Sequence, residues 1–141
     1  MRTLTALAAG VLLAVSSVVH PAVEPAKEKP PRIQVAILLD TSNSMDGLID
    51  QARGELWKVV NELARAKRGG QRAIIEVALY EYGNSRLRVQ DGYVRRVVPL
   101  TIDLDKISEE LFGLRTSGGD EWPGRALKDA TNQLDWGGDD A

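Results

Sequence analysis

The spacing of hydrophobic positions changes several times along the chain, and each spacing predicts one kind of element. Residues 33–39 (IQVAILL) are a short run of β-branched and aliphatic side chains, which predicts a strand buried on both faces. Over residues 45–64 the hydrophobic positions recur at steps of three and four, so this segment is expected to form an amphipathic helix. The helix is expected to end in residues 65–70 (RAKRGG), where cations face the negative end of the helix dipole and glycines let the chain turn.

The middle of the chain predicts two more extended segments. Residues 73–82 (AIIEVALYEY) favour a second strand, which is expected to stop at the glycine that follows. Residues 86–100 alternate loosely around Asp91 and Gly92, a pair of residues that is common in tight turns. This pattern suggests a hairpin that adds an edge strand to the sheet.

Two helices are predicted after the hairpin. Residues 103–114 carry hydrophobic side chains at helical spacing, and residues 115–122 predict a loop. Pro123 is expected to open the last helix, because proline fits the first helical position. Strands that alternate with helices in this order are typical of an α/β sandwich.

The segments before residue 32 predict export rather than folding. Residues 1–20 carry one early positive charge and then an apolar run, which is the layout of a secretory signal peptide. The run is shorter than the roughly 20 apolar residues of a spanning helix, so an uncleaved anchor is the less favoured alternative. Residues 21–31 (PAVEPAKEKPP) are proline-rich and predict an extended linker. The protein is therefore expected to be periplasmic or extracellular.

The composition removes several kinds of chemistry. The chain has 18 Lys and Arg against 20 Asp and Glu, for a formal net charge of -2, which argues against a nucleic-acid partner. It contains no Cys, and its single histidine, His20, lies in the predicted signal peptide. Thiolate sites, imidazole-bound zinc and a Ser-His relay are therefore not expected in the mature protein. Carboxylates and hydroxyls are left, and these are ligands for Mg²⁺, Mn²⁺ or Ca²⁺.

The residues that follow the first predicted strand carry such oxygens. Asp40, Ser42 and Ser44 alternate along the segment that joins the strand to the first helix. In an open α/β sheet, ligands bind at the carboxyl ends of the strands, so these three side chains are candidate metal ligands. A simpler alternative is that they only cap the helix and stabilise the turn.

Residues 40–44 (DTSNS) resemble the first motif, Asp-x-Ser-x-Ser, of the metal-ion-dependent adhesion site of von Willebrand factor type A domains. The resemblance implies a doubly wound, Rossmann-like, three-layer sandwich. It also implies a bound Mg²⁺, with Mn²⁺ or Ca²⁺ as alternatives, held by Asp40, Ser42 and Ser44. A protein partner would complete the site with an acidic side chain. The implied role is adhesion or scaffolding rather than catalysis.

In this family a second loop supplies a threonine after a pair of glycines. Here the residue after Gly118 and Gly119 is Asp120, so Asp120 is the favoured second ligand, and Thr116 is the alternative. The same residues also fit a plain turn and helix cap. Asn43, within the first loop, and Trp122, beside the second, are candidate contacts for a protein partner, since aromatic residues anchor interfaces. An equally weighted alternative is that Trp122 covers the sheet edge.

The resemblance covers residues 32–136. Members of the family carry further strands, one of which pairs with the first strand and ends in a loop with another acidic residue of the site. The domain at residues 32–141 is therefore expected to be incomplete at its C-terminus, truncated after about three strands and three helices.

Two other functions stay open on the sequence alone. Asp40 suggests phosphoryl transfer, in which an aspartyl nucleophile works with Mg²⁺. Thr41 and Ser42 follow it, however, where such enzymes commonly carry a second acid. The other alternative is a structural module that binds no metal.

Overall fold

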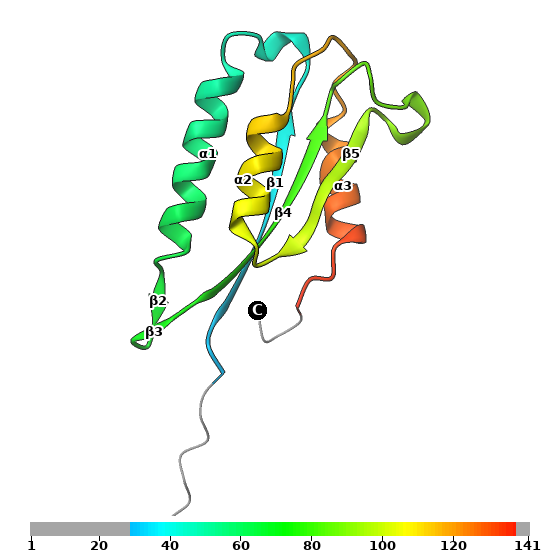
Figure 1. Cartoon of the computed structure of the whole chain (residues 1–141). Helices are drawn as coiled ribbons and strands as arrows, with labels where there is room; N and C mark the ends of the chain where they lie inside the picture. Colours follow the sequence, from blue (N-terminus) through cyan, green and yellow to red (C-terminus); the bar gives the residue numbers. More distant parts are fainter. Residues whose placement is uncertain (1–28, 138–141) are drawn as a thin grey trace, which may run out of the picture.

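The computed structural model describes residues 29–137, which form a mixed three-stranded sheet with helices on both faces (Figure 1). The strands are β1 (Arg32–Asp40), β4 (Ile74–Tyr82) and β5 (Val94–Thr101), in the order β1-β4-β5. β1 runs parallel to β4, and β5 runs antiparallel to β4. Because β1 and β4 are parallel, their carboxyl ends meet at one edge of the sheet.

Three helices connect and cover the strands: α1 (Ile49–Leu63), α2 (Leu104–Gly113) and α3 (Pro123–Gln133). The smaller elements are the two 3₁₀ turns η1 (Asn43–Met45) and η2 (Val89–Asp91) and the short strands β2 (Lys67–Arg68) and β3 (Gln71–Arg72). β2 and β3 pair with each other as a separate ribbon, which extends from the end of the sheet where β1 begins (Figure 1).

One face of the sheet carries large aliphatic side chains and is covered by α1 and α2 (Figure 1). Val77 and Leu79 of β4 are completely buried there against Ile107 and Leu111 of α2 and Val60 of α1. Burial of one such side chain contributes about 1.5–3 kcal/mol, so this face forms the larger part of the core.

The other face is covered by α3, and its side chains are smaller. Ala126 and Ala130 of α3 pack against Ala78 and Tyr80 of β4. Alanines let the helix approach the strands closely, while Tyr80 fills the remaining space. The expectation of an α/β fold is confirmed.

The predicted elements agree with the observed ones except at the two ends of the first helix and in the predicted hairpin. The first helix starts at Ile49 rather than at residue 45, because residues 43–45 form the turn η1 first. The basic segment at residues 65–70 does not simply end the helix, since its last residues enter the β2–β3 ribbon. Residues 86–93 form a loop instead of the first arm of a hairpin, and β5 pairs directly with β4.

The predicted signal peptide at residues 1–20 and most of the linker at residues 21–31 lie outside the described residues. Within residues 29–137, no helix has the length and hydrophobicity that are needed to cross a membrane.

Candidate functional site

Three loops meet at the carboxyl ends of β1 and β4. The loop after β1 donates from Thr41 N to the carbonyl of Tyr82 at 2.9 Å, and the α2–α3 loop donates from Ser117 N to the carbonyl of Thr41 at 2.9 Å. The loop after β4 donates from Ser85 N to the carbonyl of Gly118. A side chain at Gly119 would collide with the backbone of Gly83, so the last two loops touch through glycine. The site is therefore built on backbone contacts between segments far apart in the sequence.

The loop after β1 folds three of the predicted ligands together. Asp40 Oδ1 accepts a hydrogen bond from Ser42 N at 2.8 Å, which closes a small turn at the end of the strand. The 3₁₀ turn η1 then brings the hydroxyl of Ser44 to 2.8 Å from the hydroxyl of Ser42. The alternation of Asp40, Ser42 and Ser44 in the sequence thus becomes one cluster of oxygens.

A second carboxylate reaches this cluster from the loop before α3. Glu121 Oε1 accepts hydrogen bonds from Ser42 Oγ at 2.8 Å and from Ser44 Oγ at 3.1 Å. Gly83 lies between the two acids, since a Cβ atom there would be 2.8 Å from Asp40 Oδ1 and 3.3 Å from Glu121 Cγ. Glu121 was not predicted from the sequence, because two acids stand side by side in this loop and only the tertiary structure shows which one reaches the serines.

The two second-loop residues expected from the sequence, Asp120 and its alternative Thr116, make no hydrogen bond to the serines of this cluster. Thr116 Oγ1 donates to Asp46 Oδ1 and makes no hydrogen bond to Ser42 or Ser44. Asp120 is exposed and makes no hydrogen bond or ion pair within residues 29–137. The structure thus links Asp40, Ser42, Ser44 and Glu121 through hydrogen bonds, whereas Thr116 and Asp120 take no part in these hydrogen bonds.

The two candidate partner contacts are both at the surface. Trp122 follows Glu121 and is 56% exposed. Asn43 is exposed between the two serines and lies against Gly118, because a Cβ atom at Gly118 would be 3.0 Å from Asn43 Nδ2. Each residue is thus a direct neighbour in the sequence of a member of the oxygen cluster, and its side chain is exposed.

The site is negatively charged. Asp40 and Glu121 have no ion-pair partner among the described residues, whose ion pairs lie elsewhere. The pKa of Tyr82, at the end of β4, is raised mainly by burial and further by the negative charges of Asp40 and Glu121. Two carboxylates that lie close together repel each other, so a cation bound between them would stabilise the site.

The donor set suits a hard divalent cation. No group of three or more His, Cys, Asp or Glu side chains with metal-binding geometry occurs within the described part of the chain. The oxygen cluster instead combines two carboxylates with two hydroxyls, from Asp40, Glu121, Ser42 and Ser44. Mg²⁺ binds through one or two carboxylates and keeps several open positions for water or another ligand.

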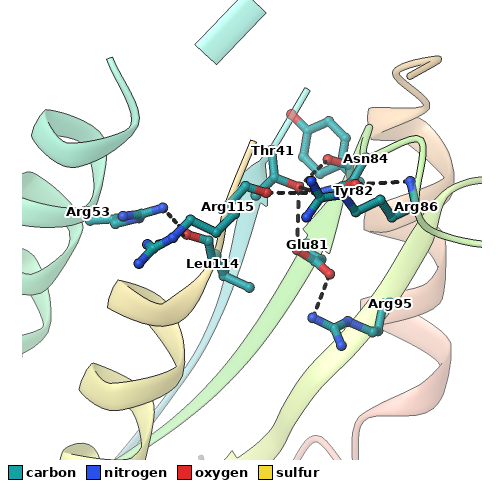
Figure 2. Close-up of polar contacts among 9 residues, drawn as sticks. All are labelled: Thr41, Arg53, Glu81, Tyr82, Asn84, Arg86, Arg95, Leu114 and Arg115. Carbon is teal, nitrogen blue, oxygen red and sulfur yellow. Dashed lines mark hydrogen bonds and ion pairs between the residues drawn. The ribbon is translucent and has the colours of Figure 1, made fainter. Parts of the chain in front are cut away.

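A buried network of polar side chains fixes the loop that follows β1. Thr41 is completely buried, and its hydroxyl lies 3.4 Å from Glu81 Oε2 and 3.3 Å from the carbonyl of Tyr82. Asn84 Nδ2 donates to the carbonyl of Arg115 at 2.9 Å, which joins the loops after β4 and α2 (Figure 2). These contacts hold the segment next to Ser42 in one position, as a preformed ligand site requires.

Arg53 of α1 fixes the start of the α2–α3 loop. Its guanidinium is almost completely buried and donates to the carbonyl of Leu114 at the end of α2 (Figure 2). Arg53 Nη1 also contacts Asp50 Oδ1 at 2.9 Å. Burial lowers the pKa of Arg53 from its usual high value, and the charge of Asp50 opposes this effect. The loop that carries Glu121 is thus anchored to α1.

No protein-family model matches the chain, and no curated protein matches it by sequence. Solved structures do match it. An uncharacterized protein of Alicyclobacillus acidocaldarius aligns with a TM-score of 0.56 at 17% identity, over 73% of this chain and 40% of that one.

Two further matches are pilus proteins. The three N-terminal domains of the type V pili tip protein Mfa5 of Porphyromonas gingivalis align with a TM-score of 0.53 at 21% identity, over 73% of this chain and 17% of that one. The pilus adhesin SpaC of Lactobacillus rhamnosus GG, in its open conformation, aligns with a TM-score of 0.50 at 19% identity, over 73% of this chain and 12% of that one. The chain thus spans less than half the length of these proteins. At such identities the likeness concerns the fold alone.

Proposed function

We propose that this chain is a metal-dependent protein-binding domain in which Asp40, Ser42, Ser44 and Glu121 hold a divalent cation. Mg²⁺ is the first candidate, with Mn²⁺ or Ca²⁺ as alternatives. A partner protein would offer an acidic side chain to an open position of the ion. The role would be adhesion or scaffolding outside the cytoplasm, without catalysis.

The observation that carries this proposal is the convergence of Glu121 on the two serines. Glu121 Oε1 lies within 3.1 Å of both hydroxyls, although it is 79 residues away from Ser42 in the sequence. A helix cap or a turn accounts for Asp40 and its contact with Ser42 N, but it needs no second carboxylate. A cation site requires negatively charged and neutral oxygens in one place, and the carboxylates of Asp40 and Glu121 with the two hydroxyls supply them.

Each side chain has a distinct part in the proposed site. Asp40 and Glu121 supply the negative charge, and the hydroxyls of Ser42 and Ser44 supply neutral oxygens. The bound ion would supply a positive centre that attracts a partner's carboxylate. Among the second-loop residues we favour Glu121 as the direct ligand, because Asp120 and Thr116 make no hydrogen bond to Ser42 or Ser44.

The proposed fold is the doubly wound sandwich of von Willebrand factor type A domains, which residues 40–44 resemble. Support comes from the parallel pair β1 and β4, the helices on both faces, and the position of the oxygen cluster at the carboxyl ends of the strands. The names of two structural neighbours, a pili tip protein and a pilus adhesin, agree with a role in adhesion.

The exposed side chains around the cluster fit a protein partner better than a small ligand. Trp122 and Asn43 are exposed and adjoin Glu121, Ser42 and Ser44 in the sequence, so they would contact the segment that carries the acidic residue. An exposed tryptophan next to a charged centre is a common anchor at protein interfaces.

The test is thermal unfolding with and without MgCl₂, with NaCl of equal ionic strength as the salt control. Magnesium at 100 times its dissociation constant should stabilise the wild type by about 2.7 kcal/mol. Asp40→Ala and Glu121→Gln should abolish this stabilisation. Glu109→Gln, which changes an exposed acid of α2, should retain it.

The same experiment separates the alternatives. Equal magnesium stabilisation in the wild type and in Glu121→Gln would remove Glu121 from the site. A wild-type protein that ignores Mg²⁺, Mn²⁺ and Ca²⁺ alike would favour the metal-free structural module.

A further inference from the structure

A cavity of about 350 Å³ lies on the α2 side of the sheet, below the loops that form the candidate metal site. Its walls come from the end of β4, the loop that follows, the start of β5 and the end of α2. The residues that matter for its chemistry are Glu81, Asn84, Arg86, Arg95, Glu110 and Arg115. Figure 2 draws five of these six side chains. Three arginines therefore surround one small space.

The acceptors in the floor of this cavity are already occupied. Glu81 is 3% exposed, and its Oε1 forms an ion pair with Arg95 Nη2 at 2.6 Å (Figure 2). Its other oxygen lies 3.4 Å from the hydroxyl of Thr41. Asn84 Oδ1 accepts from the backbone nitrogen of Arg86 at 3.0 Å. These oxygens are therefore not available to accept hydrogen bonds from a ligand.

The donors around the cavity are only partly used. Arg115 Nη1 donates to the carbonyls of Phe112 and Leu114, at 3.3 and 3.1 Å, and leaves its other nitrogens open. The side chain of Arg86 makes no hydrogen bond or ion pair within residues 29–137. Each guanidinium carries five N–H groups in a planar fork that matches a carboxylate.

The charges leave a net positive cavity. Glu81 is neutralised by Arg95, and the other charged side chains that line the cavity are Arg86, Arg115 and Glu110, which leave one positive charge in excess. A carboxylate that enters the cavity would gain ion pairs without displacing a pair already formed.

We propose that this cavity binds a second acidic side chain of the protein that engages the metal site. The inference rests on the proposed function for the identity of the partner. Asn84 follows Gly83 of the metal site, and Thr41 precedes Ser42, so the two sites share their loops. A segment with two acidic residues would bind the ion with one and the arginines with the other. The partner's specificity would then depend on the spacing of its acids.

The test uses a short acidic peptide, acetylated tetra-glutamate, followed by amide chemical shifts of the whole chain. The buffer is freed of metal over a chelating resin, because a soluble chelator is itself a polycarboxylate. The peptide should shift the resonances of Asn84 and Arg86 with saturation, and tetra-glutamine should not. Metal-free conditions keep the outcome independent of the metal site, so either proposal can fail alone.

Arg86→Gln is the informative variant, because this side chain has no hydrogen-bond or ion-pair partner to lose in the described part of the chain. It should lower the affinity for the tetra-glutamate peptide about three- to fivefold, which corresponds to the loss of one exposed ion pair. Arg86→Lys should lower this affinity less than Arg86→Gln does, since lysine keeps the positive charge but not the planar fork of N–H groups. Arg68→Gln, an exposed arginine of β2 at the far end of the sheet, should change nothing.

Three results would overturn the inference. Equal weakening by Arg86→Gln and Arg68→Gln would mean general charge attraction. Absence of saturable shifts with tetra-glutamate would mean no carboxylate site. Shifts of Asn84 and Arg86 by inorganic phosphate, with none by the peptide, would assign the cavity to a phosphate ligand instead.

Discussion

The two ends of the sheet differ in the contacts that fix their conformation. At the carboxyl ends of β1 and β4 three loops touch one another through backbone hydrogen bonds, and two acids lie close together with no ion-pair partner among residues 29–137. At the other end the β2–β3 ribbon extends from the domain and carries exposed cations (Figure 1). One end is constrained by contacts from distant segments, whereas the other is a local turn. The difference separates positions that are fixed by contacts between distant segments from positions with only a local conformation.

Glycine shows this difference most clearly. Gly83 and Gly70 both adopt a left-handed conformation, with φ of +79° and +81°. A Cβ atom at Gly83 would meet Asp40, Glu121 and Ser42, but a Cβ atom at Gly70 would meet nothing within 4 Å. The backbone requirement is thus the same at both ends, and only the carboxyl end adds a packing requirement.

The largest expected effect comes from asparagine at these two glycines. Asparagine tolerates the left-handed region, so it isolates the cost of the added side chain. Gly83→Asn should lower the free energy of unfolding by about 1–3 kcal/mol through overpacking, and Gly70→Asn by less than about 1 kcal/mol. Urea denaturation of both variants checks the difference. Equal losses would mean that the loops at the carboxyl end move apart easily.

The sequence predicted most of the fold because the buried elements have strong hydrophobic periodicity. Residues 33–39 and 73–82 became β1 and β4, and Pro123 opens α3 as expected. The start of α1 was missed because Met45 fits the helical spacing while the backbone of residues 43–45 turns more tightly. Hydrophobic spacing does not report such a turn.

The candidate site was predictable only where it is local. Asp40, Ser42 and Ser44 belong to one short segment, so their alternation suggested a cluster. The choice between Asp120 and Glu121 depends on how the loop runs past Gly83, a contact that no local pattern encodes. Adjacent acids in a loop therefore need the tertiary structure before one can be assigned.

A smaller effect is expected from pH at the carboxyl end. The pKa of Tyr82 is raised in the folded protein, by burial first and then by Asp40 and Glu121. The folded state thus holds this proton more tightly than the unfolded chain, whose tyrosines titrate near pH 10. Stability from Tyr82 is complete below about pH 10 and is lost as the pH rises through the folded pKa.

Two variants sharpen this expectation. Tyr82→Phe should flatten the loss of stability at high pH, measured by thermal unfolding in a series of alkaline buffers. Glu121→Gln should shift the tyrosinate absorbance of Tyr82 to lower pH, because one of the two negative charges is removed. A titration that is unchanged in Glu121→Gln would mean that burial alone raises the pKa.

The smallest effect is expected at the ribbon. Lys67 and Arg68 are exposed, and neither makes an ion pair among the described residues. Replacing either one with glutamine should change the free energy of unfolding by less than about 0.5 kcal/mol.

The ribbon variants also test whether the two ends act independently. The nine residues of β1 separate the ends by about 30 Å, several times the Debye length of about 8 Å at physiological salt. Lys67→Gln and Arg68→Gln should therefore leave magnesium affinity unchanged, measured by the stabilisation that MgCl₂ produces. A severalfold change in affinity would mean that charge at the ribbon reaches Asp40 and Glu121 through the fold, and the contrast between a constrained end and a local one would fail.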